Sequence, residues 1–145
     1  MSGVSIKNFT SSSYIGQPYV FSDIAASVLP EWNISLVFVG AMRARALNKK
    51  FRGKNYVPNV LSYIAGEKSA EVIICPSEAQ KQARTFRLTP SAYCLYLFIH
   101  AVLHIKGWAH GDKMEKCERD LLARHEKAHS NRNRHRYIPD KNSGG

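Results

Sequence analysis

The stretch from Thr89 to His110 constrains the fold of this chain more than any other segment. Thr89 and Pro90 suit the N-cap and the first position of a helix, and a mostly apolar sequence follows them. Gly107 can adopt the left-handed conformation that ends a helix without steric cost. The sequence therefore predicts the most apolar helix of the chain over residues 91–106, followed by a reversal of the chain at Gly107.

Three histidines of this stretch can meet at one point. His100 and His104 are four positions apart, so on a helix their side chains leave one face about 40° apart, with roughly 6 Å of rise between them. A helix continued to His110 would rotate the third imidazole by about 240° from His104 and carry it away. A helix that stops at Gly107 instead allows His110 to fold back toward the pair.

Three neutral imidazoles form a ligand set for one divalent metal ion per chain. With only three protein ligands, zinc keeps a fourth position open for water, which is typical of catalytic rather than structural sites. The pKa of such a water is brought toward about 7, so hydroxide becomes available at neutral pH. We therefore expect His100, His104 and His110 to bind Zn²⁺, with another borderline ion such as Ni²⁺ as the alternative.

The same histidine spacing occurs in zinc peptidases, whose motif is H-E-x-x-H-x-x-G-x-x-H. In those enzymes the glutamate after the first histidine is the general base. Ala101 occupies that position here. A zinc metallopeptidase is therefore a minor alternative, because it would need a carboxylate from elsewhere in the chain.

The charge of the chain indicates a polyanionic partner. The formal net charge is +10 and the isoelectric point is near 9.7. Phosphates release condensed counterions when a basic protein binds them, which makes such binding favourable and salt-sensitive. A soluble basic protein without a nucleic-acid partner would have the same composition, so charge alone does not decide the function.

The rest of the sequence predicts one α/β domain in which strands come early and helices dominate late. Periodicity and turn residues predict strands at 4–9, 33–39, 60–64 and 71–75, and the last two strands are expected to form an antiparallel hairpin. Besides the helix over 91–106, they predict helices at 22–29, 41–51 and 112–128 and a short helix that begins at residue 76. We expect a domain over residues 1–128 and a basic, mobile tail over residues 129–145, because that tail is polar and nearly without apolar residues.

The cysteines and the apolar segments predict a cytoplasmic protein. The three cysteines are odd in number and widely spaced, which is typical of a reducing compartment. The first residues carry no basic segment followed by a long apolar one. The longest apolar run, Tyr93–Ile99, is too short to span a bilayer, so no membrane association is expected.

Three segments together resemble the YbeY family of bacterial ribosomal RNA maturation factors. Residues 47–63, LNKKFRGKNYVPNVLSY, are similar to the family's L-N-x-x-[FY]-R-G-x-x-x-P-T-[ND]-V-L-S-F stretch, and residues 100–110, HAVLHIKGWAH, to its H-G-x-L-H-L-x-G-Y-D-H motif. Between them, Glu71–Pro76 resemble the family's G-D-I-x-I-[CS] strand. Two departures are Ala101 and Ala109, which replace the glycine and the aspartate of the histidine motif.

The resemblance implies a single α/β (α+β) domain in which a small mixed β-sheet packs with about five helices, one of them a zincin-like metal helix. It also implies a zinc-dependent, single-strand-specific endoribonuclease, hence a hydrolase, acting in maturation and quality control of small-subunit ribosomal RNA. In the family, the arginine of the R-G segment lies near the metal and is held to matter for catalysis, and Arg52 matches it. A guanidinium can contact two oxygens of a phosphorane-like transition state.

Further residues are candidates for substrate binding. The family places Asn59 and Ser62 beside the metal cleft, whereas Lys49, Lys50 and Lys54 surround Arg52 in sequence and are candidate phosphate contacts. Expected partners are RNA, above all small-subunit ribosomal RNA, together with ribosomal proteins or a ribosome-associated GTPase. The main alternative function is a metal-stabilised RNA- or ribosome-binding assembly factor without turnover.

Overall fold

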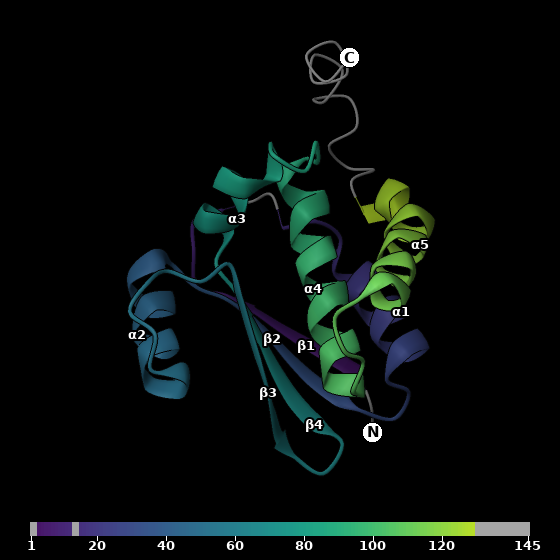
Figure 1. The fold of residues 1–145 in the computed structure, drawn as a ribbon, viewed down its shortest axis with the longest axis horizontal. Helices are drawn as coiled ribbons and strands as arrows, with labels where there is room; N and C mark the ends of the chain where they lie inside the picture. The colour runs from purple at the N-terminus through teal and green to yellow at the C-terminus, as the bar shows by residue number, and fades with distance from the viewer. Residues whose placement is uncertain (1–2, 13–14, 130–145) are drawn as a thin grey trace.

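The computed structural model describes residues 3–12 and 15–129 (Figure 1). Its elements, in chain order, are β1 (Gly3–Asn8), α1 (Pro18–Val28), β2 (Asn33–Phe38), α2 (Ala41–Arg52), β3 (Val60–Gly66), β4 (Ser69–Ile74), α3 (Pro76–Ala83), α4 (Pro90–Lys106) and α5 (Asp112–His129). The tail predicted to be mobile lies outside the described residues except for its first residue, and so do its arginines.

The four strands form one mixed sheet in the order β1-β2-β4-β3. β1 pairs with β2 and β2 with β4 in parallel, whereas β3 pairs antiparallel with β4. The predicted hairpin and the mixed sheet are therefore confirmed. Parallel neighbours need a crossover connection, and α1 is the helix that connects β1 to β2.

The alternating strands divide the apolar side chains between two faces of the sheet. One face, with Leu36 of β2 and Ile74 of β4, joins the main core beneath α1, α4 and α5. The other face carries a smaller core in which Ala44 of α2 packs with Leu61 and Ile73. Figure 1 accordingly shows α2 apart from the other helices.

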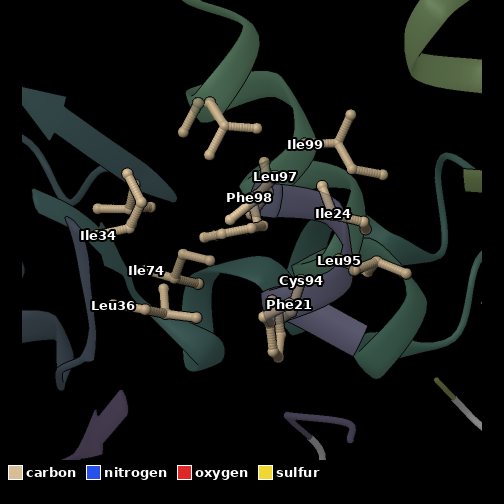
Figure 2. Packing of buried hydrophobic residues seen from close by; sticks show 14 of the residues in the cluster. Phe21, Ile24, Ile34, Leu36, Ile74, Cys94, Leu95, Leu97, Phe98 and Ile99 are labelled. Carbon is tan, nitrogen blue, oxygen red and sulfur yellow. The ribbon is translucent and has the colours of Figure 1, made fainter. Parts of the chain in front are cut away.

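Helix α4 is the centre of the main core. Eleven of its 17 residues are buried, so it has almost no solvent face along most of its length. Figure 2 shows Phe98 of α4 beside Phe21 of α1, and their rings lie 5.1 Å apart in an edge-to-face arrangement. This burial fixes the helix in position, and its two exposed residues, His104 and Lys106, both lie in its last turn.

The ends of α4 agree with the prediction from the sequence, whereas the start of α1 does not. Thr89 caps α4 by accepting a hydrogen bond from the backbone N–H of Ala92 at 3.2 Å. Helix α1 begins at Pro18, four residues earlier than predicted, because Pro18 occupies the first helical turn rather than the preceding loop. Proline suits that position because the N–H that it lacks would have no partner within the helix.

Over the residues that the structure describes, none of the helices has both the length and the apolar character needed to cross a membrane.

Candidate functional site

The C-terminal end of α4 reverses the chain as the sequence predicts. Gly107 has a φ of 106°, in the left-handed region, and its N–H donates to the carbonyl oxygen of His104 at 2.9 Å. The N–H of Trp108 donates to the carbonyl oxygen of Leu103 at 3.1 Å. A Cβ at Gly107 would meet nothing within 4 Å, so the backbone angle rather than space favours glycine here.

This reversal brings three imidazoles together. The ligand nitrogens of His100, His104 and His110 all lie within 4.8 Å of one another. The Nε2 atoms of His104 and His110 are 2.8 Å apart, and nitrogens bound tetrahedrally to one zinc ion would be about 3.4 Å apart. The arrangement therefore fits a divalent cation after a small spreading of the rings, with neutral nitrogen donors of the type that zinc accepts.

A buried carboxylate orients the first of these histidines. Glu118 of α5 is only 3% exposed, and its Oε2 lies 2.5 Å from Nδ1 of His100. Its Oε1 accepts a hydrogen bond from the hydroxyl of Tyr96 at 3.3 Å. A carboxylate bound to Nδ1–H of a histidine fixes the tautomer that leaves Nε2 free to bind a metal.

Glu118 was not among the site residues predicted from the sequence. A signal was present, because Glu118 follows Met114 by four positions and precedes Leu121 by three, which places it on the buried face of α5. A glutamate at such a position is a candidate for a buried polar contact, because carboxylates are almost never fully buried unless they are paired.

Burial affects the protonation of two side chains in this cluster. Desolvation, with smaller effects from His100 and His110, lowers the pKa of His104 from its ordinary value. Burial, followed by the negative charge of Glu118, raises the pKa of Tyr96 to about 12. At neutral pH, His104 is therefore neutral with a lone pair available, and the Tyr96 hydroxyl keeps the proton that it donates to Glu118.

The histidines line a cavity of about 500 Å³ that Arg52 of another helix also borders. Arg52 is the last residue of α2, and its Nη1 lies 3.4 Å from the hydroxyl of Tyr56 and 3.5 Å from Oδ1 of Asn48. Asn48 is fully buried and donates to the carbonyl oxygen of Tyr56 at 3.0 Å, which ties the loop after α2 to the helix. A guanidinium and a candidate metal centre thus border one cavity.

The structure separates the other candidate residues. Ser62 on β3 is exposed and lines the cavity that contains the histidines. Asn59 lines a neighbouring cavity instead, where its Nδ2 donates to Oε1 of Gln82 at 2.7 Å. Lys49, Lys50 and Lys54 are exposed and do not line either cavity.

Comparison with known proteins places this arrangement in a family. The family model described as Endoribonuclease YbeY matches residues 5–132. The chain belongs to the YbeY family. The resemblance seen in the sequence is thereby confirmed, and the histidine cavity lies within the matched region.

Individual YbeY relatives agree with this assignment. Endoribonuclease YbeY of Burkholderia pseudomallei (strain 1710b) is 34% identical over 119 residues, which cover 74% of this chain and 60% of the relative. Endoribonuclease YbeY of Janthinobacterium sp. (strain Marseille) is 31% identical over 120 residues, or 75% of this chain and 79% of the relative. The match thus spans about three fifths of the length of the Burkholderia protein.

A solved structure shares the fold of this YbeY-family chain. The solution structure of TM1509 from Thermotoga maritima superimposes with a TM-score of 0.63 over 92% of this chain and 93% of that protein, at 18% sequence identity. Within the described residues, the small mixed sheet and the five helices that the family resemblance implied are therefore confirmed as one α/β domain.

Proposed function

We propose that this chain is a zinc-dependent, single-strand-specific endoribonuclease that acts in maturation and quality control of small-subunit ribosomal RNA. The observation that carries the proposal is the convergence of three histidine nitrogens on a cavity that Arg52 also borders. The relatives named Endoribonuclease YbeY support the nuclease activity. The net charge of +10 supports RNA as the substrate.

The histidines would hold the metal, and the residues around the cavity would act on the phosphodiester. His100, His104 and His110 would hold a divalent cation, which would supply Lewis acidity for hydrolysis when bound. Arg52 stabilises the charge that develops on the phosphate, because its guanidinium can contact two oxygens at once. The exposed hydroxyl of Ser62 is placed to donate a hydrogen bond to the substrate.

Exposed lysines outside the cavity guide the RNA strand toward it. Lys49 and Lys50 lie on the last turns of α2 and Lys54 follows in the adjoining loop, on either side of Arg52 in sequence. Contacts of this kind position a phosphate backbone without selecting a sequence. Ribosomal proteins or a ribosome-associated GTPase would then direct the cytoplasmic enzyme to its ribosomal RNA.

Cleavage of a labelled single-stranded RNA by zinc-loaded protein tests the proposal. The His104→Ala variant removes one of three candidate ligands, so we expect loss of stoichiometric zinc and at least a roughly thousandfold loss of cleavage rate, since the cation supplies several kcal/mol of stabilisation. His125→Ala is the matched control, because His125 lies on α5 outside the cavity lining. A fully paired duplex of the same sequence should resist cleavage.

Two results would contradict the proposal. Equal cleavage by wild-type and His104→Ala proteins would show that the histidine cluster is not involved or that a contaminant cleaves the RNA. Binding of RNA and zinc without any turnover would favour the assembly factor over the enzyme. Cleavage of casein by zinc-loaded protein would favour the peptidase, which lacks its base because the buried Ala101 stands at that position.

A further inference from the structure

A second cavity adjoins the first and shares Arg52 with it. It has a volume of about 500 Å³, and Arg52 and Val60 line both cavities. The remaining lining comes from the loop before β3 and from one side of α3. A strand of RNA whose phosphate contacts Arg52 can therefore extend from the histidine cavity into this second cavity.

A network of hydrogen bonds fixes the polar side chains of the second cavity. Oε1 of Gln82 accepts from Nδ2 of Asn59 at 2.7 Å and from the hydroxyl of Tyr93 at 3.1 Å. Nε2 of Gln82 donates to Oε2 of Glu78 at 3.2 Å. These bonds connect α3 to α4 and to the loop that precedes β3, so Asn59, Glu78 and Gln82 are held in place before any ligand arrives.

The charges of this cavity favour a nucleobase over a phosphate group. Among the described residues that line it, Arg52 is the only cation and Glu78 the only anion. The Glu78 carboxylate has an exposed fraction of 20% and also pairs with Lys81 at 3.6 Å. A phosphate beside this carboxylate would be repelled, whereas an uncharged ring with N–H groups can donate hydrogen bonds to its remaining acceptor sites.

Tyr56 adds a surface suited to an aromatic ring. It lines the second cavity and is 50% exposed, although it is a large aromatic residue. Proteins that bind single strands commonly stack unpaired bases on exposed aromatic side chains. An aromatic face, two amides and a carboxylate thus occur together beside the arginine that we assign to the phosphate.

We infer that this second cavity binds the base of the nucleotide next to the cleaved phosphate and that Glu78 makes it favour bases with an amino group. Guanine, adenine and cytosine each present an exocyclic amine to a carboxylate. Uracil presents a single N–H between two carbonyl oxygens, and the carboxylate repels these two oxygens. This inference rests on the proposed function, because it assumes an RNA substrate at the histidine cavity.

Single-stranded RNA oligonucleotides that differ only in the base on either side of the cleaved bond test the inference. At one of these two positions, the base should determine the efficiency of cleavage. There we expect kcat/KM of zinc-loaded wild-type protein to be about tenfold higher for an oligonucleotide with guanine, adenine or cytosine than for one with uracil. Glu78→Gln adds an N–H donor, so it should lower kcat/KM for the amino-bearing bases and raise it for uracil. Glu78→Ala should remove the preference without a gain for uracil.

The control is Glu67→Gln, which removes the same charge in the exposed turn between β3 and β4 and should keep the wild-type preference. Equal cleavage of all bases by wild-type protein, or an unchanged preference in both Glu78 variants, would overturn the inference.

A wild-type protein that cleaves no RNA would overturn the proposed function instead. In that case the dissociation constants of 2′-O-methyl oligonucleotides, measured by fluorescence anisotropy, decide the base preference. The same tenfold ratio and its reversal in Glu78→Gln would support the subsite, and equal affinities would reject it.

Discussion

The two walls of the histidine cavity differ in how firmly they hold their functional groups. On the α4 wall, His100 is held by the buried Glu118 at 2.5 Å, and Tyr96 in turn donates to Glu118. On the α2 wall, Arg52 is exposed at the end of the helix, and its contacts with Asn48 and Tyr56 are long, at 3.5 and 3.4 Å.

This difference corresponds to the two proposed roles. A metal centre requires nitrogens at fixed distances, so its ligands need supporting contacts that exist before the metal binds. A phosphate group can be reached by an arginine that adjusts its position as the substrate enters. We therefore expect substitutions on the α4 wall to change metal binding and substitutions on the α2 wall to change catalysis.

Arg52→Ala should produce the largest effect on the α2 wall. We expect kcat for single-stranded RNA to fall by about 10²–10³, because a charge-stabilising donor of about 3–4 kcal/mol is removed, while one zinc ion per chain remains bound. Arg52→Lys keeps the charge but not the planar fork, so it should recover only part of the rate. Loss of zinc in either variant would show that the two walls are not independent.

Glu118→Ala should have the largest effect on the α4 wall without removing a ligand. The orientation of His100 is lost, so the zinc affinity should fall by about 10- to 100-fold in a chelator-competition assay. Glu118→Gln should recover part of the affinity, because an amide oxygen can still accept from Nδ1–H. Glu115→Ala, at an exposed position of the same helix, is the control.

Thermal unfolding of the metal-free proteins distinguishes positioning from folding. A Glu118→Ala protein that unfolds near the wild-type temperature but binds zinc weakly supports the positioning role. A variant with wild-type zinc affinity would instead mean that Glu118 serves only to stabilise the packing of α5 on α4.

Lys50→Ala should have a smaller effect that depends on salt. Lys50 is exposed and outside both cavities, so its removal should raise KM a few-fold at low salt and reduce the slope of log KM against log salt by about one. Its kcat should stay at the wild-type value. The control is Lys7→Ala, which makes the same change of net charge at an exposed position on β1. An equal rise in KM in the Lys7→Ala protein would argue against a local contact between Lys50 and RNA.

The smallest expected effect is a difference in the reactivity of two cysteine thiols toward a modifying reagent in the folded protein. Burial, with a smaller effect from Cys75, raises the pKa of Cys94 to about 12, so its reactive thiolate is scarce at pH 8. Cys117 on α5 is only partly buried. In native protein a thiol reagent should modify Cys117 first and Cys94 only after unfolding. Early modification of Cys94 would show that α4 is less tightly packed than the burial of Cys94 indicates.

The sequence allowed prediction of the parts of the site that depend on local signals. Thr89, Pro90 and Gly107 define the ends of α4 through capping and backbone conformation, and the spacing of the histidines then requires the chain reversal. The family resemblance added Arg52 and the mixed sheet. These predictions needed only neighbouring residues or a motif.

Other parts could not be predicted because they depend on long-range packing. Glu118 contacts His100 from another helix, 18 positions away, and only the packing of α5 on α4 brings them together. The family resemblance places Asn59 beside the metal cleft, and the structure adds that its side-chain amide donates a hydrogen bond to Gln82 of α3 at the second cavity. The strand order β1-β2-β4-β3 likewise follows from pairings between distant segments.

The most direct test of the central claim is a titration of metal-free protein with Zn²⁺ in competition with a chelating indicator. Three converging imidazoles predict saturation at one zinc ion per chain, with the bound ion released as pH falls, because protons compete for the ligand nitrogens. An absence of saturable zinc binding, or a stoichiometry that Ala substitution of His104 does not change, would contradict the account.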